Sequence, residues 1–178
     1  MKPVKEWMER ARGRAFFQLL ILFIIVLLWP HIIPLIGGYD GLAIEMVIFA
    51  IFAMGFNLLL GYTGILSFGH AAFFGLAGYA MGLILIHLKI PILLGMLFGI
   101  ALSTVTAVLI GILIIRKTGI YFAMLTIAFG QMFYFIASQW NSVTGGQDGL
   151  TGFKRTDFLG VDIRPEVHFF YFVFLFFV

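Results

Sequence analysis

Continuous apolar stretches of membrane-spanning length constrain this chain more than any other feature of its sequence. About 20 apolar residues are needed for a helix to cross a bilayer. The stretches are continuous, whereas the strands of a β-barrel alternate apolar and polar residues. Lipid offers the backbone no hydrogen bonds, so continuous apolar segments that span a membrane must be helical. The sequence therefore predicts an all-α, polytopic transmembrane helix bundle with five spans plus a partial sixth. The predicted spans are Phe16–Ile36, Leu42–Leu60, Phe68–Leu88, Pro91–Ile115, Ile120–Ser138 and, in part, Val167–Val178.

Composition excludes the main alternatives to a membrane protein. The 178 residues are 62% hydrophobic and only 11% charged, whereas a soluble domain carries about 25% charged residues. A soluble fold of this length has too little interior to bury so much apolar surface, which excludes a soluble enzyme. The chain contains no Cys, so it has neither disulfides nor thiolate metal sites.

The basic residues predict how the chain is oriented. Residues 1–15 form a basic segment that we expect on the cytoplasmic side, either as a solvated tail or lying along the membrane surface. Residues 16–178 then form the membrane domain. Alternation from an internal N-terminus places Arg116 and Lys117 inside and the loop over 139–166 outside. A rival topology treats Leu42–Leu88 as one broken crossing, and the count of basic residues mildly favours it.

A glycine-rich stretch interrupts the apolar runs between the second and third predicted spans. Glycine leaves the backbone free to adopt non-helical angles, and broken helices in a membrane can line a solute pathway. We therefore expect non-helical backbone beside a polar cavity, although a tight turn with Thr63 or Ser67 as N-cap is an alternative. Intramembrane amides are further pathway candidates or interhelical hydrogen-bonding groups. The candidate residues are Asn57, Gly61, Gly64, Ser67, Gly69, His70 and Gln131.

His70 stands without other metal-binding residues near it in the sequence. No second His, no Cys and no carboxylate lies at ligand spacing from it. A lone His in a bundle usually bonds to a neighbouring helix. The sequence therefore predicts no metal site.

Small residues recur at four-residue spacing in the third and fourth predicted spans. Such a row lets two helix backbones approach closely, and it can alternatively line a groove. We expect helix packing at Gly78, Gly82, Gly95, Gly99, Ser103, Ala107 and Gly111.

The predicted external loop contains a second glycine-rich motif, Thr144-Gly-Gly-Gln-Asp-Gly-Leu150. Repeated glycines indicate a conformationally special turn. We interpret Thr144, Gly145, Gly146 and Gly149 as a candidate external gating loop, with a flexible connector as the alternative.

Motifs of enzymes and nucleotide-binding proteins are absent from the sequence. It contains no phosphate-binding loop and no hydrolase motif of the H-E-x-x-H or G-x-S-x-G type. The remaining function classes are a permease that depends on partner ATPases and a stand-alone channel or secondary transporter.

Three motifs in order resemble one family. Asn57–Tyr79 is similar to N-x-x-x-G-x-x-G-x-x-S-x-G-H-A-A-F-x-G-x-G-A-Y, with Leu-Ala-Gly-Tyr at its end where the family usually reads I-G-A-Y. Arg116–Gln131 is similar to R-x-x-G-x-Y-x-A-x-x-T-L-A-x-x-E/Q, and Thr144–Leu150 to T-G-G-x-x-G-L. The chain thus resembles the branched-chain amino acid ABC transporter permease family, LivM type, in its N-terminal portion.

The resemblance implies a function and a set of partners. It implies a permease subunit of a binding-protein-dependent ABC importer in the bacterial inner (plasma) membrane, moving branched-chain amino acids inward by ATP-driven alternating access. The implied partners are a second permease subunit, two cytoplasmic ATP-binding subunits and an external solute-binding protein. ATP would be bound by the partners, and this chain would hold no cofactor. Urea and short-chain amide importers share these motifs, so their permeases are the alternative.

The resemblance also bears on topology and on length. An even number of crossings after an internal N-terminus places the family's coupling segment inside, which favours simple alternation over the rival. The last apolar run covers only 12 residues, a rise of about 18 Å in a helix. We therefore expect a chain truncated within its sixth span.

Overall fold

The computed structural model describes most of the chain and shows only helices and the segments that connect them. The described residues are 17, 21, 23–35, 37–39, 41–88, 90–117, 119–152 and 164–177. The predicted basic segment, residues 1–15, lies outside them. Within this part of the chain there is no strand, so the predicted all-α fold is confirmed.

Four of the described helices are long and apolar enough to cross a membrane. They are α2 (Leu42–Thr63), α3 (His70–Leu88), α4 (Ile92–Ile114) and α5 (Ile120–Gln139). The prediction of five complete spans is therefore not met among the described residues. The first predicted span is described as an apolar helix only over Phe23–Leu35, with part of the remainder outside the description. The predicted sixth corresponds to α7 (Glu166–Phe177), which is shorter than a span.

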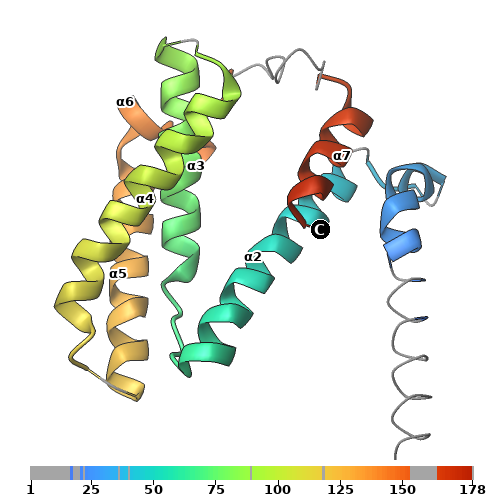
Figure 1. The fold of residues 1–178 in the computed structure, drawn as a ribbon. Coiled ribbons are helices and arrows are strands. Elements are labelled where there is room, and N and C mark those ends of the chain that lie inside the picture. Colours follow the sequence, from blue (N-terminus) through green and yellow to red (C-terminus); the bar gives the residue numbers. More distant parts are fainter. Residues whose placement is uncertain are drawn as a thin grey trace, which may run out of the picture. The chain divides into compact units, whose positions relative to one another are not determined.

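The chain forms two compact units. One unit extends from Ala50 to Arg164 and contains α3, α4 and α5, together with α6 (Asn141–Thr144) and the short 3-10 helix η1 (Gly146–Asp148). In this unit α3, α4 and α5 alternate in direction (Figure 1). The segment before α3 and the α4–α5 turn lie at one end of the unit, whereas α6 and the α3–α4 turn lie at the other (Figure 1).

This arrangement bears on the two topologies that the sequence left open. Helix α2 has 22 residues and α3 has 19, so each is long enough to cross a bilayer alone. A single broken crossing would need two half-length helices. The helix lengths therefore favour simple alternation over the rival topology.

Helix α4 packs closely against α3 through small residues. A Cβ added at Gly99 would lie 2.6 Å from the carbonyl oxygen of Ala77, and one at Gly95 would lie 3.2 Å from the Leu85 side chain. The Ser103 hydroxyl donates a hydrogen bond to the Phe73 carbonyl oxygen over 2.9 Å. Backbones this close exclude any side chain between them.

The other unit joins the described residues up to Phe49 with those from Pro165 onward. Phe170 of α7 is fully buried in it, and the rings of Phe23 and Phe174 lie 5.4 Å apart. Before α2, the Tyr39 hydroxyl donates a hydrogen bond to Glu45 over 2.6 Å. This bond raises the pKa of the Tyr39 phenol, to which desolvation and the Glu45 charge also contribute.

Large apolar side chains cover the outside of the long helices. Leu113 of α4 is 68% exposed and Phe135 of α5 is 64% exposed, and many Leu, Ile and Phe side chains resemble them. Apolar side chains exposed on several long helices fit a hydrocarbon solvent rather than water. The fold is therefore that of a membrane helix bundle.

Candidate functional site

The backbone leaves the helical conformation between α2 and α3. Helix α2 ends at Thr63, and α3 begins at His70. Gly64 has a φ of +66°, a left-handed conformation that favours glycine. The interruption therefore lies where the sequence analysis expects non-helical angles.

The interruption is fixed to α5 by the second sequence motif. The Phe68 amide donates a hydrogen bond to the Thr126 hydroxyl over 3.1 Å, and that hydroxyl donates to the Ala123 carbonyl oxygen over 2.8 Å. Gly69 is buried against the Thr126 carbonyl group, which leaves no space for a Cβ. Thr126 lies six residues after Ile120, about 9 Å along the helix, so the contact is in the first third of α5.

The alternative that Thr63 or Ser67 caps α3 does not match the structure. The Thr63 hydroxyl donates to the Leu59 carbonyl oxygen within α2. Gly69 directly precedes α3, and its carbonyl oxygen accepts the Ala72 amide over 3.0 Å. Glycine, and not a hydroxyl residue, therefore occupies the N-cap position.

A cavity of about 690 Å³ lies beside the interruption, and it is mainly apolar. Ser67, Gly69, His70 and Thr126 contribute to it, but Leu, Ile, Phe, Ala and Gly residues of α2 to α5 make up most of its lining. This cavity therefore does not supply the polar cavity that the sequence analysis expects beside the interruption. The reason is that the helices around it present their apolar faces inward.

His70 contacts aromatic rings. Its ring centroid lies 4.9 Å from that of Phe52 and 6.2 Å from that of Phe56, both on α2. Within the described part of the chain, no three His, Asp or Glu residues lie close enough together to hold a metal ion. The structure thus places His70 in an aromatic contact.

Asn57 and Gly61 lie on an exposed part of α2. A Cβ added at Gly61 would be 3.9 Å from the Asn57 side-chain oxygen, an ordinary contact distance. Neither residue lines a described cavity, and neither does Gly64. These three pathway candidates therefore do not share a described cavity with Gln131.

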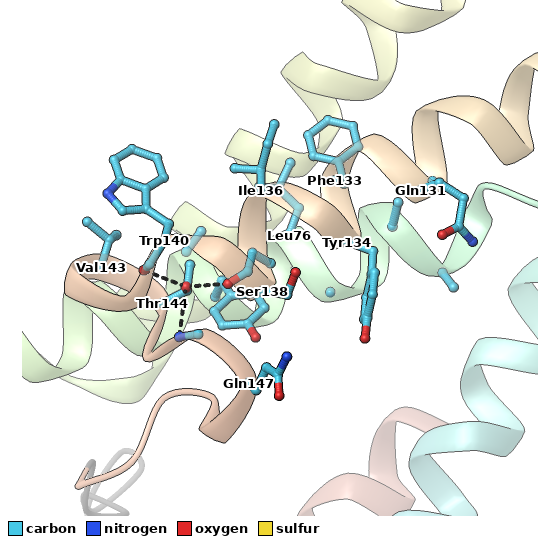
Figure 2. Close-up of a pocket in the computed structure, with 18 of the residues that line it drawn as sticks. Leu76, Gln131, Phe133, Tyr134, Ile136, Ser138, Trp140, Val143, Thr144 and Gln147 are labelled. Carbon is cyan, nitrogen blue, oxygen red and sulfur yellow. Dashed lines mark hydrogen bonds between the residues drawn. The ribbon is translucent and has the colours of Figure 1, made fainter.

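Gln131 lines a larger groove, of about 950 Å³, between α3 and α5. The groove begins at Phe68, just before α3, and follows α3 to Leu83, and α6 and η1 border it at the end away from the interruption. Figure 2 shows Gln131 toward one end of the groove and Trp140 and Val143 toward the other. Small residues of α3, such as Ala71 and Gly75, leave the space that the groove occupies.

Four polar side chains line the groove without an internal partner. Gln131 and Tyr134 are on α5, Tyr79 is on α3 and Gln147 is in η1, and none of them makes a hydrogen bond within the described part of the chain. The described lining contains no Asp, Glu, Lys, Arg or His. The groove therefore offers donors and acceptors without formal charge.

The glycine-rich loop closes one end of the groove in a defined conformation. The Thr144 hydroxyl is buried and donates to the carbonyl oxygens of Ala137 and Trp140, and it accepts the Gly146 amide over 3.3 Å (Figure 2). Gly145, Gly146 and Gly149 all have positive φ, from +64° to +78°.

This loop also contacts α3. A Cβ added at Gly145 would overlap the Gly149 carbonyl, and one added at Gly82 of α3 would lie 3.0 Å from Leu150. These contacts describe a compact cap. Thr144 and Gly146 line the groove directly, together with Gln131.

Some of the small residues expected to pack between helices do not contact a neighbouring helix. Nothing lies within 4 Å of a Cβ added at Gly78 or Gly111. Ala107 and Gly111 line the cavity beside the interruption. The small residues in contact with α3 are thus confined to the first half of α4.

The sequence analysis did not single out Tyr79, Thr126, Tyr134 or Gln147. Helical spacing could have found Tyr134, because it lies three residues after Gln131 and therefore on the same face of α5. No local signal joins Tyr79 to Gln147, since the fold alone brings them to one groove.

These features define a polytopic membrane helix bundle with an interrupted helix pair and an uncharged groove. Comparison with known proteins gives its family. Residues 38–178 match the model described as branched-chain amino acid transport system / permease component, and the chain belongs to this family.

Two curated relatives are similar to the chain. Both are named high-affinity branched-chain amino acid transport system permease protein LivM, one from Salmonella typhimurium and one from Escherichia coli. They are 24% and 22% identical over 144 residues, or 81% of this chain. The chain spans about a third (33%) of the length of each relative. No solved structure matches the chain.

Proposed function

We propose that this chain is a portion of the membrane domain of a permease subunit in a binding-protein-dependent ABC importer of the bacterial inner membrane. The importer moves branched-chain amino acids inward. The observation that carries the proposal is the family match over residues 38–178, which includes all three sequence motifs. The four helices of spanning length support a multi-pass membrane location.

ATP-driven alternating access would supply the transport step. Two cytoplasmic ATP-binding subunits would hydrolyse ATP, a second permease subunit would complete the pathway, and an external solute-binding protein would deliver solute. This chain itself would bind no ATP and no cofactor. The basic residues before the first span support a cytoplasmic N-terminus.

The fold of the Ala50–Arg164 unit is compatible with this orientation. With the N-terminus inside, alternation places Arg116 and Lys117 inside and the Thr144–Leu150 cap outside. The α4–α5 turn and α6 lie at opposite ends of the unit, as this orientation requires (Figure 1). The cap would then face the solute-binding protein.

Uptake by the reconstituted importer tests the proposal. The whole permease that contains this chain is placed in proteoliposomes with its partner subunits, and uptake of labelled leucine and of labelled urea is measured with and without ATP. We expect ATP-dependent uptake of leucine. Uptake of urea alone would identify the alternative amide importer, and uptake without ATP would identify a stand-alone transporter; either result contradicts the proposal.

A further inference from the structure

The groove between α3 and α5 has the size and the chemistry of a small-molecule site. Its volume of about 950 Å³ is within the range of about 300–1,000 Å³ that such sites occupy. Most of its lining is apolar, with a few convergent polar groups, which is the usual composition of a ligand pocket. The groove lies entirely within the Ala50–Arg164 unit.

Two helix faces present the polar groups to the groove. On α5, Gln131, Tyr134 and Ser138 follow one another at spacings of three and four residues, so they share one face. On α3, Gly75, Tyr79 and Leu83 follow one another at spacings of four residues and likewise share one face. The polar groups thus face a space floored by small and aliphatic side chains.

The charge of the lining limits the ligand. No described lining residue carries a formal charge, so an ion with net charge would lose its hydration without gaining a counter-charge. Carboxamide and phenol groups each provide both donors and acceptors. They can therefore bond the carboxylate and the ammonium of a zwitterion, which has no net charge.

The apolar and polar parts of the lining also exclude other occupants. A lipid chain would leave Gln131, Tyr134 and Gln147 without hydrogen-bond partners in an apolar contact, which is unfavourable. Urea has no apolar part to match the aliphatic floor. A solute with a small zwitterionic head and an aliphatic side chain uses both kinds of surface.

We propose that this groove is a solute-binding site for net-neutral, zwitterionic amino acids with aliphatic side chains, and that Gln131 and Tyr134 bond their polar head. The inference rests on the proposed transport function and deepens it by assigning the site. The Thr144–Leu150 cap borders the groove at one end.

A comparison of variants tests the assignment in the reconstituted importer. Gln131→Leu removes the carboxamide but keeps the bulk of the side chain, and loss of its hydrogen bond should raise about tenfold the leucine concentration that half-protects a thiol in the groove from labelling. Gln139→Leu is the matched control, because Gln139 is an exposed residue of the same helix outside the groove lining. An unchanged half-protecting leucine concentration in Gln131→Leu would overturn the proposal.

Labelling with a thiol reagent tests the site without transport. The chain contains no Cys, so Ser138→Cys or, if that variant fails to fold, Val143→Cys places a single thiol in the groove when the remainder of the permease and the partner subunits are cysteine-free. We expect a water-soluble maleimide to label it, and leucine to slow labelling where lysine, glutamate and urea do not. Gln139→Cys should be labelled without protection.

The failures of the two proposals are distinguishable. An absence of labelling in the groove would show that lipid or a neighbouring helix fills it, and labelling without protection by leucine would show that it does not bind leucine; each outcome overturns the site. An absence of ATP-dependent uptake with intact protection by leucine would instead overturn the transport function and leave the site standing.

Discussion

The backbone amide of Phe68 donates a hydrogen bond to the Thr126 hydroxyl over 3.1 Å, joining residues that are 58 positions apart. Phe68 belongs to the interruption between α2 and α3, and Thr126 belongs to the second motif on α5. Gly69 packs against the same threonine's carbonyl group. Two motifs that are separate in the sequence therefore form one contact in the fold.

Removing the Thr126 hydroxyl should destabilise this contact. Thr126→Val keeps the shape of the side chain but leaves the Phe68 amide without its partner, at a cost of about 1–3 kcal/mol. Thermal unfolding in detergent measures the effect. Thr126→Ser keeps the hydroxyl and serves as the control, so equal destabilisation by both variants would contradict the role of the hydrogen bond.

The close approach of α4 to α3 predicts opposite effects at two glycines of one helix. Gly99→Ala places a Cβ 2.6 Å from the Ala77 carbonyl oxygen, and such overpacking should cost about 1–3 kcal/mol. Gly111→Ala enters open space and should be neutral or stabilising by up to about 1 kcal/mol, because alanine favours helix. Melting temperatures in detergent compare the two, and a neutral Gly99→Ala would contradict the packing.

The cap after α5 should depend on Gly145. A side chain there needs a φ of +78° and would overlap the Gly149 carbonyl. Left-handed backbone alone costs about 1–2 kcal/mol for a residue other than glycine, so Gly145→Ala should open the cap. Limited proteolysis between α5 and α7 should become faster in Gly145→Ala but not in Asp148→Ala, which changes an exposed side chain of the same cap. Equal cleavage of both variants would count against a compact cap.

Alkaline pH should weaken the bond between Tyr39 and Glu45. The hydrogen bond to Glu45 raises the pKa of the Tyr39 phenol above its ordinary value of 10.0. A raised folded-state pKa means that the neutral phenol stabilises the fold below pH 10, and that this contribution is lost as the pH rises through the folded-state pKa.

Ultraviolet titration measures this pKa. The difference between the wild type and Tyr39→Phe isolates one of the chain's six tyrosines, and its midpoint should lie above that of free tyrosine. Glu45→Gln removes the carboxylate charge and should lower the midpoint again. A Tyr39 midpoint at or below 10 in the wild type would refute the expected effect of Glu45.

Local patterns in the sequence predict the helices and the positions where they end. Four of the predicted spans correspond to α2, α3, α4 and α5, because the apolar length needed to cross a bilayer can be recognised from composition alone. The glycines after Thr63 likewise indicate non-helical backbone. The apolar cavity beside them was not predictable, because it depends on which faces of four helices meet.

The sequence by itself determined that this chain is a membrane helix bundle with two glycine-rich interruptions, since these properties depend on runs of neighbouring residues. Only the tertiary structure decided what each glycine does. Helix α5 leaves no space for a Cβ at Gly69. A Cβ at Gly61 would make only an ordinary contact, and one at Gly111 would lie in open space. The same holds for the groove, where Tyr79 and Gln147 meet Gln131 only because α3, η1 and α5 pack together. Sequence periodicity reports which face a residue occupies, but the partner of that face is set by contacts between distant segments.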